Sequence, residues 1–131
     1  MFASNAIVQS TMKGVSNFTY VPVDDIYNHV FEINGKNILA THGDSVKVKN
    51  DNVLAEQSLL YNKTLDLIVA GHFHGHQVRE VGYDKYICIF GSFKGSDDFS
   101  VKIGRSSSRS QGCIIFAENG DFDIRQVKIG G

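Results

Sequence analysis

The stretch AGHFHGH, residues 70–76, places three of the chain's five histidines at every second position. It follows the apolar run LDLIVA, residues 65–70, which is typical of a short strand buried on both faces. On an extended backbone, residues two apart point to the same side, so the imidazoles of His72 and His74 can converge. The flanking glycines allow the backbone to approach a ligand closely. Because neutral imidazole is the commonest transition-metal ligand, the pattern favours a metal site over histidines that are only packed or solvated.

A second strand end repeats this arrangement. In ILATHGDS, residues 38–45, an apolar run is followed by His42, a glycine and Asp44. If the two strands are neighbours, His42 joins His72 and His74 in a crevice at the ends of the strands, where α/β sheets bind ligands. Asp44 either orients an imidazole through its free N–H or serves as a turn residue, and the sequence leaves both open. His29, inside the run NHVFEI, is interpreted as an ordinary strand side chain.

These two motifs carry a resemblance to a known family. THGD at 41–44, followed about thirty residues later by GHFH at 71–74, resembles the C-terminal half of the calcineurin-like metallophosphoesterases. The tail from Gly91 to Gly112 also looks like phage and bacterial members of the DNA-repair-exonuclease-like type. The resemblance implies an α/β, strand-rich fold that forms half of a β-sandwich flanked by helices. It covers most of the chain from Asn28 onward.

The resemblance also implies a metal centre. In the family, two metals about 3.5–4 Å apart hold a phosphate; by analogy His42 and His72 bind one metal and His74 the other. The expected cofactor is Mn, Fe or Zn, and the sequence leaves open whether this chain alone holds it. The family motifs D-x-H, G-D-x-x-D and G-N-H are missing, and with them the bridging carboxylate and the phosphate-contacting groups. A single zinc held by the same three histidines, with an open fourth position, is the alternative.

Three further residues are weaker site candidates. His76 lies outside the family motif and either supports the metal ligands or faces water. Arg105 and Arg109, in GRSSSRS, either contact a phosphate or belong to a polar loop. The catalytic residues themselves remain unknown, because their counterparts in the family lie in the missing motifs.

Composition narrows the protein class. The chain has 131 residues, 42% of them hydrophobic, and a net charge of −1, which indicates a single globular domain over 1–131. The near-neutral charge does not indicate nucleic-acid binding, although it leaves it possible. We expect no membrane segment and no signal peptide, and therefore a cytoplasmic protein. Cys88 and Cys113 each lie in an apolar run and are expected to be buried and reduced.

The remaining pattern predicts mostly strands. Two hairpins are expected, one turning at Asn34-Gly35 between residues 28–33 and 36–43, the other turning at 119–121 between 112–118 and 122–129. Strands are also expected at 77–82 and 85–92. Helices are expected at 2–14 and at 53–63, the latter capped by Asp51 or Asn50. The segments 44–51 and 93–110 are predicted to be polar loops, and 18–23 to be extended.

Two functions from different classes follow. The first is the metal-binding half of a metal-dependent phosphoesterase that acts on phosphomonoesters or phosphodiesters and is incomplete as a catalyst by itself. The second is a non-catalytic remnant that acts as a binding or structural module; a metal-free regulator with coincidental histidines is a third reading. Because half of a sandwich leaves apolar sheet surface uncovered, we expect self-association or pairing with an N-terminal half.

Overall fold

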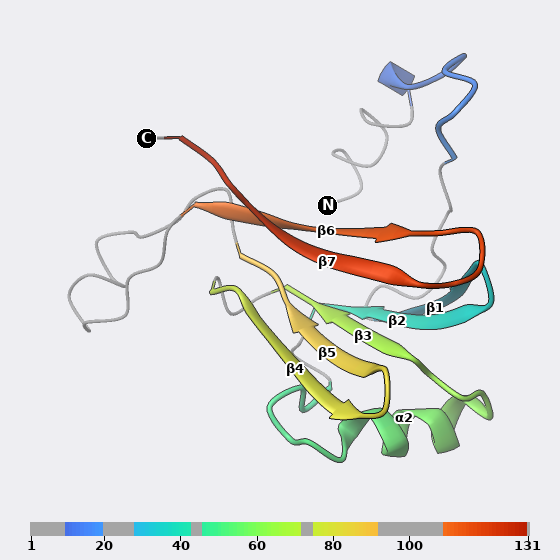
Figure 1. Ribbon diagram of the computed structural model, residues 1–131, viewed down its shortest axis with the longest axis vertical. Helices are drawn as coiled ribbons and strands as arrows, with labels where there is room; N and C mark the ends of the chain where they lie inside the picture. The colour runs from blue at the N-terminus through green and yellow to red at the C-terminus, as the bar shows by residue number, and fades with distance from the viewer. Residues whose placement is uncertain (1–9, 20–27, 43–45, 72–74, 92–108, 131) are drawn as a thin grey trace.

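The computed structural model describes residues 10–19, 28–42, 46–71, 75–91 and 109–130. Within these ranges the chain forms a five-stranded sheet, a two-stranded sheet and the helix α2 (Figure 1). The elements are β1 (Asn28–Ile33), β2 (Lys36–Thr41), α2 (Val53–Tyr61), β3 (Leu67–Ala70), β4 (Gln77–Gly82), β5 (Lys85–Ile89), β6 (Ser110–Phe116) and β7 (Phe122–Lys128). The prediction of a strand-rich α/β fold is confirmed.

Both predicted hairpins form. β1 and β2 are antiparallel with Ile33 paired to Lys36, and Asn34 and Gly35 adopt φ angles of 48° and 84°. Positive φ at both central residues suits the twist of a two-residue hairpin turn. β6 and β7 pair in the same way from Phe116 and Phe122 outward. Local sequence is sufficient to form both hairpins, because their pairing needs no distant residue.

The centre of the larger sheet is parallel. The strand order is β1-β2-β3-β5-β4, with β2, β3 and β5 parallel and the two edge strands antiparallel to their neighbours. α2 is the crossover between β2 and β3. As a result, the carboxyl ends of the three central strands lie at one edge of the sheet.

Each face of the five-stranded sheet is covered by a different layer. One face packs against α2 and the segment before it; the buried residues there are Leu39, Val46, Val48, Val53, Leu54, Leu65, Ile68, Ala70, Ile87 and Ile89. The other face packs against the β6–β7 hairpin, where the buried hydrophobic residues among those described are Ile38, Leu67 and Cys88. The aromatic side chains of this second layer are only partly buried, among them Phe31, Tyr86, Phe116 and Phe122. The β6–β7 hairpin therefore covers part of the apolar sheet surface that half of a sandwich is expected to expose, and part of that surface remains accessible to solvent.

The tips of the two hairpins contact each other. The side-chain amide of Asn34 donates to the carbonyl oxygen of Ala117 at 2.8 Å. Gly120, at φ 93°, lies so close to this turn that an added Cβ would come within 2.8 Å of the Asn34 carbonyl oxygen. This contact fixes how the small sheet lies across the large one.

Several local predictions were wrong. The segment expected to be a polar loop contains Val46 and Val48, which are 3% and 1% exposed and belong to the core. The N-cap of α2 is Asn52, which makes no side-chain capping bond; the Asn50 side chain accepts instead from the Asn52 N–H at 2.9 Å. Cys88 is buried as expected, but Cys113 is exposed, and both are free thiols.

Other predicted segments fall largely outside the described residues. Of the helix expected at 2–14, residues 10–14 are described, and Gly14 has the positive φ, 86°, expected of a helix end. The extended segment at 18–23 and the loop at 93–110 lie mostly outside the described ranges. Among the residues that are described, no helix is long and apolar enough to cross a membrane.

Candidate functional site

The ends of β2 and β3 are adjacent, which is the condition under which the two sequence motifs can form one site. Thr41 and Ala70 are register partners in the parallel pair, and His42 and Gly71 follow them directly. The Gly71 N–H donates to the Thr41 carbonyl oxygen at 3.4 Å. His42, which is exposed, therefore begins one loop and Gly71 the neighbouring loop at the same edge of the sheet. His72, His74 and Asp44 lie outside the described residues, so their side chains are not placed here.

His76 lies at the same edge and packs against an aromatic ring. It comes directly before β4, and its imidazole stacks on Phe90, with ring centroids 5.9 Å apart and planes 9° apart. The Phe90 N–H donates to the Ala70 carbonyl oxygen at 2.9 Å, which joins this pair to the end of β3. The Nδ1 atom of His76 is buried and has no hydrogen-bond partner among the described residues. His76 is therefore partly packed rather than fully solvated.

Close contacts near Phe90 leave no room for a side chain at Gly91 or Gly112. A Cβ on Gly112 would collide with the Phe90 ring, and one on Gly91 would collide with the Ser110 hydroxyl. These contacts bring the start of β6 against the end of β5. By contrast, a Cβ on Gly71 or Gly75 would meet no atom of the described residues within 4 Å, so packing against that part of the chain does not require these two glycines.

Arg109 also reaches this side of the molecule. It is exposed, directly precedes β6, and its carbonyl oxygen accepts from the Ile129 N–H at 3.0 Å. Because the next residue, Ser110, lies against Gly91 at the end of β5, the backbone of Arg109 is near the edge that carries the candidate ligands. Arg105 lies outside the described residues.

The donor chemistry fits a divalent transition metal, since neutral imidazole suits zinc, iron and manganese. Within the described ranges no group of three histidine, cysteine or carboxylate side chains is placed to hold a metal ion. His42 is the one predicted ligand that these ranges include.

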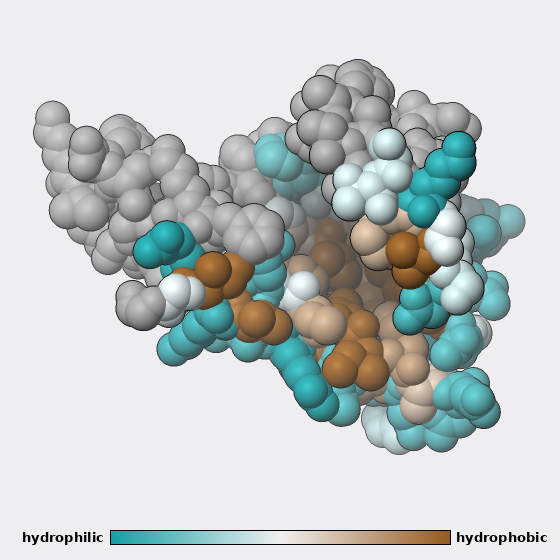
Figure 2. All heavy atoms as spheres, turned by 90° about the horizontal axis from the view of Figure 1, so that it is seen from above, coloured by the Kyte–Doolittle hydropathy of each residue, from teal (hydrophilic) through white to brown (hydrophobic). Residues whose placement is uncertain are grey.

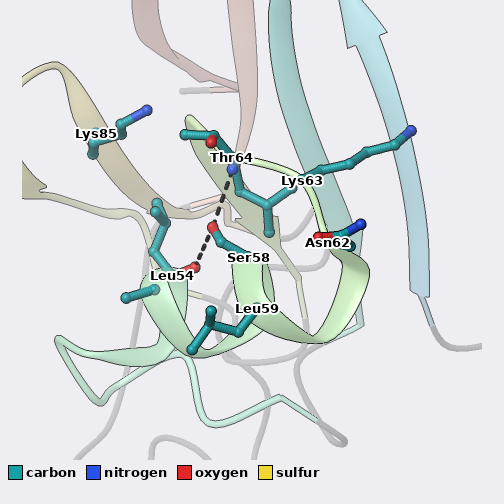
Figure 3. A pocket seen from close by; sticks show the side chains of 9 residues that line it. Leu54, Ser58, Leu59, Asn62, Lys63, Thr64 and Lys85 are labelled. Carbon is teal, nitrogen blue, oxygen red and sulfur yellow. Dashed lines mark hydrogen bonds between the residues drawn. The ribbon is translucent and has the colours of Figure 1, made fainter.

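A groove of about 560 Å³ lies at the opposite edge of the sheet and was not predicted (Figure 3). It is lined by Leu54, Ala55, Ser58, Leu59, Asn62, Lys63, Thr64, Leu65 and Lys85. Leu65 comes two residues before β3, and Lys85 is the first residue of β5, so the groove is at the amino ends of the strands. The pair Leu59-Leu60 near the end of the predicted helix was the signal that could have indicated it.

Comparisons with known proteins identify the fold. No protein-family model matches the sequence, and no curated protein matches it either. Solved structures do match. Wild-type Vps29 from Entamoeba histolytica, complexed with Zn²⁺, is 18% identical with a TM-score of 0.57 over 86% of this chain and 66% of that one. The chain has a metallophosphoesterase-like fold.

Two further structures share the metallophosphoesterase-like fold. Vacuolar Protein Sorting 29 from Cryptosporidium parvum is 14% identical, with a TM-score of 0.55 over 97% of this chain and 76% of that one. A protein from Streptococcus pneumoniae described as a predicted phosphoesterase is 12% identical, with a TM-score of 0.50 over 88% of this chain and 67% of that one. The chain spans about two thirds of the zinc-complexed Vps29 and of the streptococcal protein.

Proposed function

We propose that this chain supplies the imidazole ligands of a divalent-metal site for phosphoester hydrolysis. The ligands are His42, at the end of β2, and His72 and His74, which follow β3. The observation that supports this most directly is the parallel pairing of Thr41 with Ala70, because it brings His42 and Gly71, the residue before His72 in the sequence, to the same edge. The two strand ends meet where ligands bind in open α/β sheets.

The imidazoles alone make an incomplete two-metal site. Two divalent ions held about 4 Å apart repel each other strongly unless carboxylates lie between them. We infer that the missing carboxylates come from a second polypeptide segment, an N-terminal half of the fold. We expect that segment to pack beside the two-stranded sheet. Aromatic side chains there are only partly buried, namely Phe31, Tyr86, Phe116 and Phe122. Figure 2 shows hydrophobic side chains in a hollow on the face seen from above.

Each predicted residue then has a distinct role. The three histidines hold the metal as neutral bases, and Asp44 orients one of them. His76, stacked on Phe90, supports the loop that carries His72 and His74. Arg109, and Arg105 with it, contacts the phosphate ester. A bound divalent ion supplies Lewis-acid stabilisation of the charge that develops on the phosphate.

A non-catalytic binding module is the second candidate. It is supported by the exposed apolar side chains on α2, Leu59 at 84% and Leu60 at 71% exposure, because such surface is typical of protein interfaces. Its histidines would hold one ion or none.

Metal content and turnover separate the two functions. The full chain is purified, loaded in turn with Mn²⁺, Fe²⁺ or Zn²⁺, and tested for bound metal by mass spectrometry and for hydrolysis of bis-p-nitrophenyl phosphate. Stoichiometric metal that is lost in His42→Ala, His72→Ala and His74→Ala supports the proposed site, and turnover supports the enzyme. His29→Ala is the histidine control outside the predicted ligand set; His29 pairs with Ala40 near the end of β2, and its imidazole stacks on Phe31. Metal retained in all three variants would exclude the site. Because this chain lacks the carboxylates that we assign to a second segment, metal without turnover fits an incomplete catalyst, whereas the absence of stoichiometric metal favours the binding module.

A further inference from the structure

The outer face of α2 carries exposed leucines as well as the exposed Glu56. Its sequence, VLAEQSLLY, buries Val53 and Leu54 against the sheet, but Leu59 and Leu60 at the far end are 84% and 71% exposed. A surface helix usually places apolar side chains toward the core and polar ones toward solvent. Two neighbouring exposed leucines therefore indicate that the outer surface of α2 has another use.

One of these leucines borders the groove described above. Leu54, Ala55, Leu59 and Leu65 form its apolar part, and Figure 3 shows Leu54 and Lys85 on the same side of α2. The Ser58 hydroxyl makes two hydrogen bonds within the protein. It donates to the Leu54 carbonyl oxygen at 2.8 Å and accepts from the Leu65 N–H at 3.0 Å. The apolar surface is thus held rigidly between the helix and the start of β3.

The groove has a cationic lining. Among the described residues, the charged side chains that line it are Lys63 and Lys85. The Lys85 ammonium pairs with the Asp66 carboxylate at 2.6 Å, so Lys63 supplies the net positive charge of the lining, while Lys85 keeps two N–H donors. Asn62 and Thr64 add polar groups at the rim. The groove therefore complements a ligand that combines apolar and anionic groups.

We propose that this groove docks a short segment of a partner protein in which large apolar side chains alternate with carboxylates. A volume of about 560 Å³ lies within the roughly 300–1,000 Å³ typical of ligand sites and fits one or two such side chains. Leu59 packs against the apolar side chains, while Lys63 and Lys85 pair with the carboxylates.

The position of the groove makes it independent of the proposed metal site. The groove is at the amino ends of β3 and β5, whereas His42 follows the carboxyl end of β2. A partner bound there leaves the histidine edge open. The proposal goes beyond phosphoester hydrolysis and does not require it.

Peptide selection tests the proposal on the full chain. A random twelve-residue peptide library displayed on phage is selected on the wild-type protein and counter-selected on Leu59→Asp. We expect enrichment of peptides that place leucine, phenylalanine or isoleucine beside aspartate or glutamate.

The affinity of the best peptide is then measured by fluorescence anisotropy, with a fluorescein label on the synthetic peptide. It should bind at least tenfold more weakly to Leu59→Asp and to Lys63→Glu than to the wild type. Leu60→Asp is the matched control, because Leu60 is exposed on the same helix turn but does not line the groove, and it should change affinity less than twofold.

The contrary outcomes are equally specific. Enrichment of basic or uncharged peptides, or no enrichment, would overturn the proposal. So would a selected peptide that binds equally well after its carboxylates are replaced by amides. If sedimentation shows a wild-type dimer that Leu59→Asp converts to a monomer, a second copy occupies the groove and the partner proposal is wrong.

Discussion

The backbone N–H of Gly71 donates a hydrogen bond to the carbonyl oxygen of Thr41, with the two atoms 3.4 Å apart. This bond joins the ends of two parallel strands that are separated in sequence by α2. Each strand end is followed by a segment that carries candidate metal ligands. The relationship is the structural basis for treating His42 and the AGHFHGH stretch as parts of one site.

Gly71, at the end of β3, allows a test that separates an effect on metal binding from an effect on the free energy of unfolding. A Cβ on Gly71 would meet no atom of the described part of the chain within 4 Å, and its φ is not positive. We expect Gly71→Ala to change the free energy of unfolding by less than about 0.5 kcal/mol. If the backbone must approach the ion closely, the same variant should bind Co²⁺ at least tenfold more weakly by titration calorimetry. Unchanged Co²⁺ affinity would show that the glycine is not needed by the ligand loop.

The contact between the hairpin tips predicts a large difference between two glycine substitutions. Gly35 and Gly120 both have positive φ, 84° and 93°, so alanine is strained at either. Only at Gly120 would the added Cβ also press against the Asn34 carbonyl oxygen. We expect Gly35→Ala to lower the free energy of unfolding by about 1 kcal/mol and Gly120→Ala by about 2 kcal/mol or more. Urea denaturation of both variants measures the difference, and equal losses would show that the tips do not pack as described.

The ion pair at Asp66 should matter more than the one at Asp84. The Asp66 carboxylate accepts from Lys85 at 2.6 Å and from the Asn37 N–H at 2.9 Å, and its side chain is only 14% exposed. Asp84 meets Lys36 at 3.5 Å and is 45% exposed. Asp66→Ala should therefore destabilise the fold by about 2 kcal/mol, and Asp84→Ala by less than about 1 kcal/mol. Thermal unfolding of the two variants provides the comparison, and a reversed order would refute it.

The two cysteines should differ in reactivity. Burial raises the pKa of Cys88 to about 12, so its thiol is protonated and shielded at pH 8, while Cys113 is exposed. Because the thiolate is the reactive form, the native protein should react with Ellman's reagent at Cys113 only, and both thiols should react in guanidinium chloride. Cys113→Ser should abolish the native reaction. Rapid native labelling of the Cys113→Ser protein would contradict the burial of Cys88.

The same pKa has a consequence at alkaline pH. Unfolding releases a thiol whose ordinary pKa is 9.0, so above that pH the unfolded state loses a proton that the folded state keeps. The stabilising contribution is complete below pH 9 and falls as the pH rises toward 12. Urea midpoints between pH 8 and 10.5 should therefore fall more steeply for the wild type than for Cys88→Ala. Parallel curves would show that Cys88 does not contribute.

Local patterns in the sequence were sufficient to predict both hairpins and the buried strand β3. Asn34-Gly35 determines the register of its own turn, and the run LIVA has no polar side to present to solvent. Prediction failed where distant residues decide the environment. Val46 and Val48 alternate with lysines, as loop residues could, but they are buried by α2 and the sheet. Cys113 lies in an apolar run, yet it points away from the larger sheet because its strand has one open face.

The site could be predicted only in its outline. Strand–His–Gly and Gly-His-x-His indicated two strand ends, and the parallel pairing of β2 and β3 brings those ends together. The stacking of His76 on Phe90 could not be foreseen, because Phe90 directly follows another strand, β5, and is positioned by its contact with Gly112. The groove was missed for a similar reason, since it forms only where α2 meets Leu65 and Lys85.

The joint between Asn34 and Ala117 links residues 83 positions apart. Each hairpin can form early from neighbours in the chain, but closing so long a loop carries an entropic penalty that only the assembled layers repay. We expect this hydrogen bond to form late in folding and to break first when denaturant is added. The smaller sheet should then separate from the larger one as a unit. The amides of β6 and β7 should then exchange with deuterium before those of β3.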